Sequence, residues 1–217
     1  MTAIVLPSVA MKQQRWNQRY AAEAHEWTTE PCPLVVKLAG ERAPGRALDI
    51  AAGTGRNAIH LARTGWTVTA VDFSEEGIRF GRERAGDLGV GLTWLVEDVT
   101  TWEAPVAAFD LVTICYLHLP WEAFAAAARA AWRAVAPGGT LAVVGHDRTN
   151  IADGHGGPQD PAVLYTPDDL EPLFEGARIV RSEQLRHAVD HGDAAGTGAE
   201  QIDCVVVAVR DADEHGD

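Results

Sequence analysis

Two closely spaced glycines stand between an apolar run and a helical pattern near residue 50. The run Leu48–Ile50 leads into Gly53 and Gly55, and the helical pattern begins at Arg56. Because glycine has no Cβ, such a turn brings backbone N–H groups close to a ligand at the start of the following helix. Many strand-to-helix turns use glycine for geometry alone, so the loop by itself leaves both interpretations open.

Carboxylates accompany three successive apolar runs that are typical of buried strands. Asp49 belongs to the first run, Asp72 ends the second, nineteen positions after Gly53, and Asp98 follows the third. A carboxylate at Asp72 can accept hydrogen bonds from both hydroxyls of a ribose, and one at Asp98 can receive an exocyclic amine proton. Alone, each acid is also explained as a solvated strand end or a helix cap. Their joint placement favours a binding site.

These residues resemble the class I S-adenosylmethionine-dependent methyltransferase family, and within it the small-molecule enzymes of the tellurite-resistance and thiopurine type. The family's acid followed by small residues and Gly-x-Gly is similar to the stretch from Asp49 to Gly55. The early pair Trp16-x-x-x-Tyr20 is also similar to what those proteins show. Ala51 departs from the pattern, because many relatives have glycine there. It is tolerated on condition that its φ is negative.

The resemblance implies S-adenosylmethionine as cofactor and assigns a role to each matching residue. The residues implied in cofactor binding are Asp49, the backbone from Ala51 through Gly53 to Gly55, and Asn57 around the methionine part, Asp72 and Phe73 at the ribose and adenine, Asp98 and Val99 at the adenine amine, and Cys115 beside the methyl group.

Candidate substrate-side residues lie on an early aromatic helix and after the later strands. Trp16 and Tyr20 favour a lid over the cofactor, since an aromatic face suits a cationic sulfonium, although core packing of an amphipathic helix explains them equally well. His118 and His146 are the candidate catalytic residues. His146 follows an apolar run and Gly145, so we expect it at the carboxyl end of a strand as a general base. A hydrogen-bonded surface histidine is the alternative for each.

Two other classes of function stay open. Gly53-x-Gly55-x-x-Ala58 with Asp72 also fits a nicotinamide- or flavin-dependent oxidoreductase. Asp98 has no clear task beside a pyrophosphate, Asp49 would repel one, and no second βαβαβ half is evident, so this class is disfavoured. A non-catalytic cofactor-binding regulatory module is the other alternative.

Alternating patterns place these residues on an α/β fold. Five apolar runs have the length of buried strands, at 47–51, 67–71, 93–96, 111–115 and 140–144. Helical patterns lie between them at 56–63, 75–88 and 121–135. Longer strands at 177–189 and 201–209 suggest a terminal hairpin. We therefore expect a Rossmann-like three-layer sandwich whose mostly parallel seven-stranded sheet ends in a C-terminal antiparallel hairpin.

The two ends of the chain differ in character. Helical patterns at 12–27, with Trp16, Tyr20 and Trp27 on one face, and at 33–42 precede the first strand. We expect residues 1–45 to form a helical cap or lid, and residues 46–217 to form the methyltransferase domain. The segment 148–161 is rich in glycine and is expected to be an irregular loop near the ligand.

The amino-acid composition limits which classes of binding partner are expected. The 217 residues carry 18 Lys and Arg against 31 Asp and Glu, a formal net charge of −13, which disfavours nucleic acid as a partner. Three widely spaced cysteines indicate a reducing, cytoplasmic setting, and no metal-ligand spacing is evident. No apolar run approaches the ~18 residues of a membrane span. The expected partner is a small-molecule acceptor, and the expected state is a monomer or homodimer.

Overall fold

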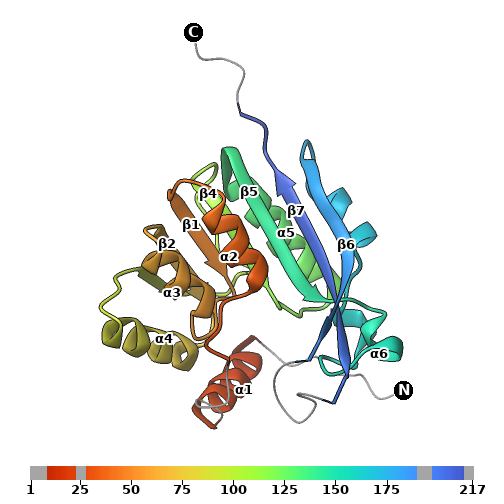
Figure 1. The fold of residues 1–217 in the computed structure, drawn as a ribbon. Helices are drawn as coiled ribbons and strands as arrows, with labels where there is room; N and C mark the ends of the chain where they lie inside the picture. Colours follow the sequence, from red (N-terminus) through yellow and green to blue (C-terminus); the bar gives the residue numbers. More distant parts are fainter. Residues whose placement is uncertain (1–8, 23–27, 190–196, 213–217) are drawn as a thin grey trace.

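The structure is a computed structural model that describes residues 9–22, 28–189 and 197–212 (Figure 1). Its strands are β1 (Arg46–Ile50), β2 (Thr67–Asp72), β3 (Thr93–Val96), β4 (Phe109–Cys115), β5 (Val135–His146), β6 (Arg178–Ala188) and β7 (Glu200–Val209). Its helices are α1 (Val9–Ala22), α2 (Pro33–Gly40), α3 (Arg56–Arg63), α4 (Glu75–Asp87), α5 (Trp121–Ala134), α6 (Asn150–Asp153) and α7 (Pro167–Leu170), with short 3₁₀ turns at Pro161–Val163 and Glu171–Leu173.

All seven strands form one sheet in the order β3-β2-β1-β4-β5-β7-β6. The first five strands pair in parallel, whereas β7 runs antiparallel to both β5 and β6. The expected Rossmann-like sheet with a C-terminal antiparallel hairpin is therefore confirmed. β6 is one of the two edge strands and carries charged residues along its length, a composition that protects an open edge from pairing with another chain.

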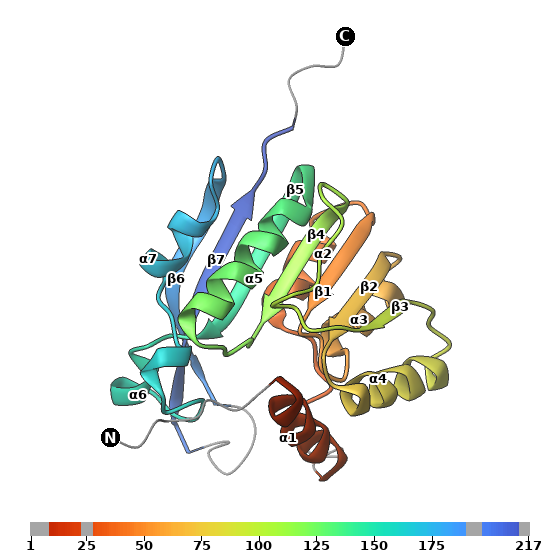
Figure 2. The same cartoon turned by 180° about the vertical axis from the view of Figure 1, so that it is seen from behind.

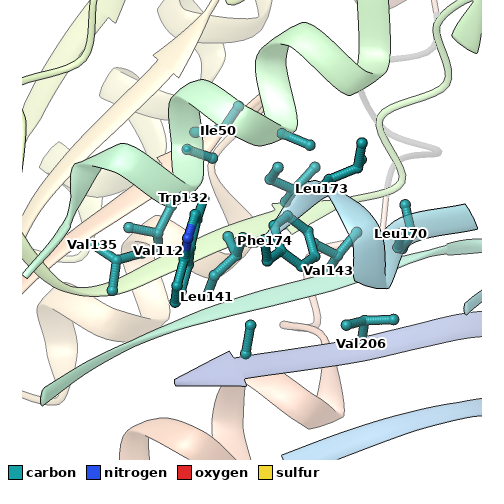
Figure 3. Close-up of a cluster of buried hydrophobic side chains, with 14 of the residues drawn as sticks. Ile50, Val112, Trp132, Val135, Leu141, Val143, Leu170, Leu173, Phe174 and Val206 are labelled. Carbon is teal, nitrogen blue, oxygen red and sulfur yellow. The ribbon is translucent and has the colours of Figure 1, made fainter. Parts of the chain in front are cut away.

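Alternation along the central strands creates two apolar faces. On one face Leu141 and Val143 of β5 pack with α5 and with Leu170, Leu173 and Phe174 (Figure 3). On the other face Ala142 and Val144 pack with α2 and α3. Because successive strand residues point to opposite sides, one strand supplies both cores. Figures 1 and 2 show α2 and α3 on one side of the sheet and α5 on the other, which gives three layers.

Several predicted boundaries need correction. The helix expected at 121–135 ends at Ala134, and the strand expected at 140–144 extends from Val135 to His146. The added residues include Gly138, whose N–H donates to the Arg210 carbonyl, and Gly139, whose carbonyl accepts from the Arg210 N–H after β7. The helix expected at 12–27 is described as Val9–Ala22, and Trp27 lies outside the described residues. The loop 148–161 contains the short helix α6.

The carboxyl ends of the parallel strands share one edge of the sheet. Figure 1 shows α1 and α6 at this end, below the strands. α1 is held there by the turn between β2 and α4, because Gln13 donates to the Phe73 carbonyl at 2.6 Å and the Ser74 hydroxyl donates to Asn17 at 2.6 Å. In the described part of the chain, no helix combines the length and apolarity needed to cross a membrane.

Candidate active site

The loop between β1 and α3 is held by left-handed backbone conformations. Gly53 has φ of 56° and Gly55 has φ of 76°, values that L side chains rarely adopt. Ala51 has φ of 56° as well. The condition set for Ala51, a negative φ, is not met, so this residue holds backbone strain of roughly 1–2 kcal/mol.

Close approach explains why two of these positions are glycine. A Cβ at Gly53 would lie 2.6 Å from the hydroxyl oxygen of Tyr20, which comes from α1. A Cβ at Gly55 would collide with the indole of Trp94 on β3. The loop is thus packed under Tyr20 on one side and against Trp94 on the other, and only a bare backbone fits.

Asp49 is fully enclosed at the end of β1. Its carboxylate accepts hydrogen bonds from the Thr113 hydroxyl at 2.8 Å and from the Ala58 N–H at 3.2 Å. Burial raises the pKa of Asp49 to about 6, and these donors limit the rise. Asp49 therefore supports the loop from beneath and adds negative charge next to it near neutral pH.

Asp72 ties the glycine loop to the end of β2. One of its oxygens accepts from the Gly53 N–H and the other from the Ser74 N–H, both at 2.8 Å. Burial raises the pKa of Asp72 to about 6 as well. An ionised carboxylate offers about four acceptor positions, and the Phe73 N–H also lowers the pKa of Asp72, so at most two positions remain for a ligand. The structure thus gives Asp72 a supporting role in the fold that the sequence does not predict.

A cavity of about 110 Å³ lies where β2 and β3 end, lined by Gln13, Phe73, Val96, Glu97 and Asp98. Asp98 is half-buried, and one carboxylate oxygen accepts from the N–H and hydroxyl of Thr100 at 2.9 and 2.7 Å. The next residue, Val99, packs its side chain against the core on the α5 face. Phe73 and Asp98 are therefore brought together at one cavity. Because the Val99 side chain is packed in the core, Val99 could contact a ligand there only through its backbone.

Asn57 and Cys115 have protein partners that the sequence does not predict. The Asn57 side chain is buried and accepts from the Cys32 N–H at 2.8 Å, which fixes the start of α2. Cys115 packs against the core that contains Cys32, and the hydrogen bond with Cys32, together with burial, raises the pKa of the Cys115 thiol. Both residues brace α2 against the sheet beside the loop.

A second polar group lies at the ends of β4, β5 and β7. His146 Nδ1 is 3.3 Å from a carboxylate oxygen of Asp203, and the His146 and His118 rings stack at 5.1 Å between centroids. His146 retains 12% side-chain exposure, whereas Asp203 is 2% exposed. The two histidines predicted from the sequence are therefore adjacent, and a buried acid that sequence reasoning missed lies beside one of them.

Asp203 collects further donors. The Tyr116 hydroxyl donates to it at 2.7 Å, His187 Nε2 lies 2.9 Å away and Gln201 donates at 2.9 Å. Burial alone would raise the pKa of Asp203, but these hydrogen bonds and that of His146 hold it below its usual range. Asp203 could have been noticed in the sequence, because it is an acid inside the apolar run of β7. His187 lies on an exposed strand, and its sequence surroundings do not indicate a role.

His118 differs from His146 in its surroundings. Burial, with a smaller contribution from the neighbouring His146, lowers the pKa of His118 to about 3. Its Nε2 accepts a long hydrogen bond of 3.4 Å from the His146 backbone N–H. The His118 ring is therefore neutral, and its Nε2 already accepts a hydrogen bond. This suits His118 to packing more than to proton transfer.

Tyr116 joins the two polar groups. The guanidinium carbon of Arg56, at the start of α3, lies 5.4 Å from the centre of the Tyr116 ring, and that ring is 5.2 Å from His146. Tyr116 itself has a positive φ of 59°. Strain of this kind persists where the surroundings enforce it, often at functional sites. The glycine loop and the histidine pair thus share one edge of the sheet.

Part of this chain is similar to known proteins. Residues 47–139 match a family described as a methyltransferase domain. The demethylmenaquinone methyltransferase of Thermus thermophilus is 35% identical over 111 residues, which are 50% of this chain and 50% of that protein. Residues 47–139 carry a methyltransferase domain of the class I S-adenosylmethionine-dependent type.

One further relative and one solved structure are also similar to this chain. The UbiE C-methyltransferase of ubiquinone and menaquinone biosynthesis from Pseudomonas fluorescens is 32% identical over 148 residues, 65% of this chain and 56% of that protein. The TehB crystal structure from Haemophilus influenzae aligns with a TM-score of 0.71 at 17% identity, covering 92% of this chain and 67% of that one. The chain spans about half the length of the curated relatives it matches.

The residues of the methyltransferase domain fit S-adenosylmethionine, the methyl donor of this family. The bare backbone at Gly53 leaves its N–H group to the Asp72 carboxylate, which keeps acceptor capacity beside the loop. The neighbouring cavity offers the Phe73 ring and the Asp98 carboxylate to a flat base with an amine. The two buried acids suit a cationic ligand better than a pyrophosphate.

Helix α1 packs against the glycine loop through Tyr20. Trp16 and Tyr20 are in ring contact at 5.6 Å between centroids, and Tyr20 is buried. Burial, together with the nearby Asp72 charge, raises the pKa of Tyr20, so its hydroxyl stays protonated. Core packing and a covering position are thus combined in one helix, with Tyr20 directly above Gly53.

Proposed function

We propose that this chain transfers the methyl group of S-adenosylmethionine to a small-molecule acceptor. One observation carries the proposal: the glycine loop and the His146–Asp203 pair meet at the same sheet edge, with the Tyr116 ring between Arg56 and His146. A cofactor site beside a proton acceptor is what methyl transfer to a protonated acceptor requires.

The cofactor half of the site, formed by the loop from Ala51 to Gly55 with Asp49, Asp72, Phe73 and Asp98, is proposed to bind and orient the cofactor. When bound, S-adenosylmethionine supplies a methyl group on a positively charged sulfur. Asp72 is proposed to accept from the ribose hydroxyls, Phe73 and Asp98 to hold the adenine, and the backbone from Ala51 to Gly55 to enclose the methionine part. The negative charges of Asp49 and Asp72 favour a cation at this place.

The acceptor half of the site, formed by His118, His146 and Asp203, is covered by a loop. A Cβ at Gly157 would lie 2.7 Å from the His146 ring, so the glycine-rich loop after β5 packs directly over that histidine. Such confinement supports a small acceptor rather than a macromolecule, as does the net charge of −13. Since two of the relatives have quinones in their names, a quinol ring is the first acceptor we would try.

Isothermal calorimetry tests the cofactor. We expect S-adenosylmethionine and its demethylated product to bind with Kd values of about 1–100 μM, and NAD not to bind. Heat with NAD and none with either methionine derivative would favour an oxidoreductase instead.

An acceptor screen tests the reaction. The protein is incubated with S-adenosylmethionine and a quinol, a phenol, a thiol or an amine, and S-adenosylhomocysteine is measured. Cofactor binding without product from any class would point to a cofactor-binding regulatory module.

Three further expectations belong to the same proposal. Residues 1–45 are proposed to act as a cap on the methyltransferase domain, and deletion of α1 should weaken cofactor binding. The protein is proposed to be a monomer or homodimer, which light scattering distinguishes.

A cytoplasmic setting is also proposed. It agrees with Cys32, Cys115 and Cys204, all of which are free thiols.

A further inference from the structure

Asp203 is an acid in a place where an acid is costly. It lies in β7, paired with His146 of β5 in the antiparallel register, and all residues of β7 from Gln201 to Val209 are buried. Burying a carboxylate costs several kcal/mol unless hydrogen bonds replace its water. Here Tyr116, Gln201 and His187 supply hydrogen bonds, and His146 Nδ1 lies within ion-pair distance at 3.3 Å, so the acid is held as an anion at a defined position.

The two oxygens of Asp203 face different partners. Oδ1 faces His146 Nδ1 at 3.3 Å and accepts from Gln201 at 2.9 Å. Oδ2 accepts from the Tyr116 hydroxyl at 2.7 Å and faces His187 Nε2 at 2.9 Å. His146 Nδ1 is buried and, among the described residues, has no hydrogen bond within ordinary geometry, so Oδ1 at 3.3 Å is the acceptor that favours a proton on this nitrogen.

We propose that Asp203 is the positioning residue that fixes His146 as the proton acceptor of the reaction. This inference rests on the proposed methyl transfer. Asp203 holds the His146 proton on Nδ1, and Nε2 is then the basic nitrogen. The arrangement suits an acceptor whose reacting oxygen, nitrogen or carbon carries a proton that it must lose.

The step balances without any further reactant. The acceptor gives its proton to His146 Nε2, and the electron pair of that bond forms the new bond to the methyl carbon. The pair of the broken carbon–sulfur bond stays on the sulfur of the demethylated product. His146 becomes an imidazolium, whose positive charge is stabilised by the Asp203 carboxylate.

The groups around His146 support this division of roles. His118 stacks on it and is neutral, Tyr116 and Gly157 enclose it, and Asp203 is the anion in contact with it. His187 reaches the other Asp203 oxygen from β6 and is 38% exposed. His187 therefore helps to hold Asp203 and is not needed for the tautomer of His146.

Nitrogen-15 NMR of the histidine side chains tests the proposal in the full chain saturated with S-adenosylhomocysteine. In the native protein we expect His146 to carry its proton on Nδ1, the minor form of free histidine. In Asp203→Asn the amide can donate to Nδ1, so the proton should move to Nε2. Asp147→Asn is the matched control, since Asp147 is a buried neighbour that bonds Thr149 and Gln184 instead of His146.

Each outcome bears on either this inference or the proposed function. A native His146 with its proton on Nε2 would overturn the inference, whether or not the Asp203→Asn variant folds. Asp147→Asn and His187→Gln should leave the Nδ1 form unchanged, and loss of that form in both would also overturn it. Turnover confined to thiolate or selenide acceptors and insensitive to Asp203→Asn would contradict the role, while absence of cofactor binding would contradict the proposed function alone.

Discussion

The two halves of the sheet edge hold their buried acids in different ways. In the cofactor half, Asp72 accepts from two backbone N–H groups, and Asp49 accepts from one backbone N–H and one hydroxyl. In the acceptor half, Asp203 is held by side chains from the ends of β4 and β5 and from β6 and β7.

This difference has a consequence for specificity. Backbone donors stay in place when side chains change, so the cofactor half can be kept while the acceptor half varies. Side-chain donors are each removable by a single substitution, so the acceptor half is where the chemistry can be altered. We therefore expect substitutions in the first half to affect binding and substitutions in the second to affect rate.

Replacing His146 should have the largest effect and is the strongest test of that division. His146→Gln removes the basic nitrogen, and we expect kcat to fall by about 10²–10⁴ while the Kd of S-adenosylmethionine changes less than about threefold. S-adenosylhomocysteine release measures the first quantity and calorimetry the second.

His118→Gln is the matched control. Its ring is neutral and already accepts a hydrogen bond, so we expect less than a tenfold loss of kcat. If His118→Gln were the more damaging substitution, the two roles would have to be exchanged.

The same contrast explains what the sequence could predict. Gly53, Asp49 and Asp72 are found from sequence because a strand, a turn and a helix bring them together locally. Asp203 meets Tyr116 across 87 positions, through the antiparallel pairing of β7 with β5, and no local pattern encodes that register. The expectation for Ala51 is wrong because its left-handed conformation is imposed by the loop and not by its own preference.

Asp72→Ala should produce the next largest effect. The substitution removes charge-assisted hydrogen bonds of ~1.5–3 kcal/mol each from the ribose, so we expect at least a tenfold weaker Kd for S-adenosylmethionine. It also leaves the N–H groups of Gly53 and Ser74 without their acceptor. Chemical denaturation should therefore show a loss of about 1–3 kcal/mol in the free energy of unfolding.

Asp98→Ala is the comparison for that result. It removes one contact at the cavity, and its other partner is the local turn at Thr100. A greater loss of affinity in Asp98→Ala than in Asp72→Ala would mean that the adenine, and not the ribose, dominates binding.

Cofactor affinity should depend on pH through the cofactor half. Asp72 has a pKa of about 6, so about one molecule in ten is ionised at pH 5 and nearly all are at pH 7.5. The ionised form accepts from the ribose and attracts the cation, so we expect affinity to rise by up to about tenfold across this range. Calorimetry at both values measures it. The Asp72→Asn variant should show a flatter dependence, and an equally steep one would assign the titration to another group.

The smallest expected effect concerns backbone strain, which both halves of the site contain. Ala51 and Tyr116 both adopt a positive φ, at 56° and 59°. Ala51→Gly should raise the free energy of unfolding by about 1 kcal/mol, since relief of left-handed strain outweighs the extra entropy of unfolded glycine. Ala62→Gly within α3 is the control and should lower it by about 0.5–1 kcal/mol. Tyr116 cannot be relieved in this way, because its hydroxyl holds Asp203. Denaturant unfolding that showed Ala51→Gly to be less stable than the native chain would exclude a left-handed residue 51.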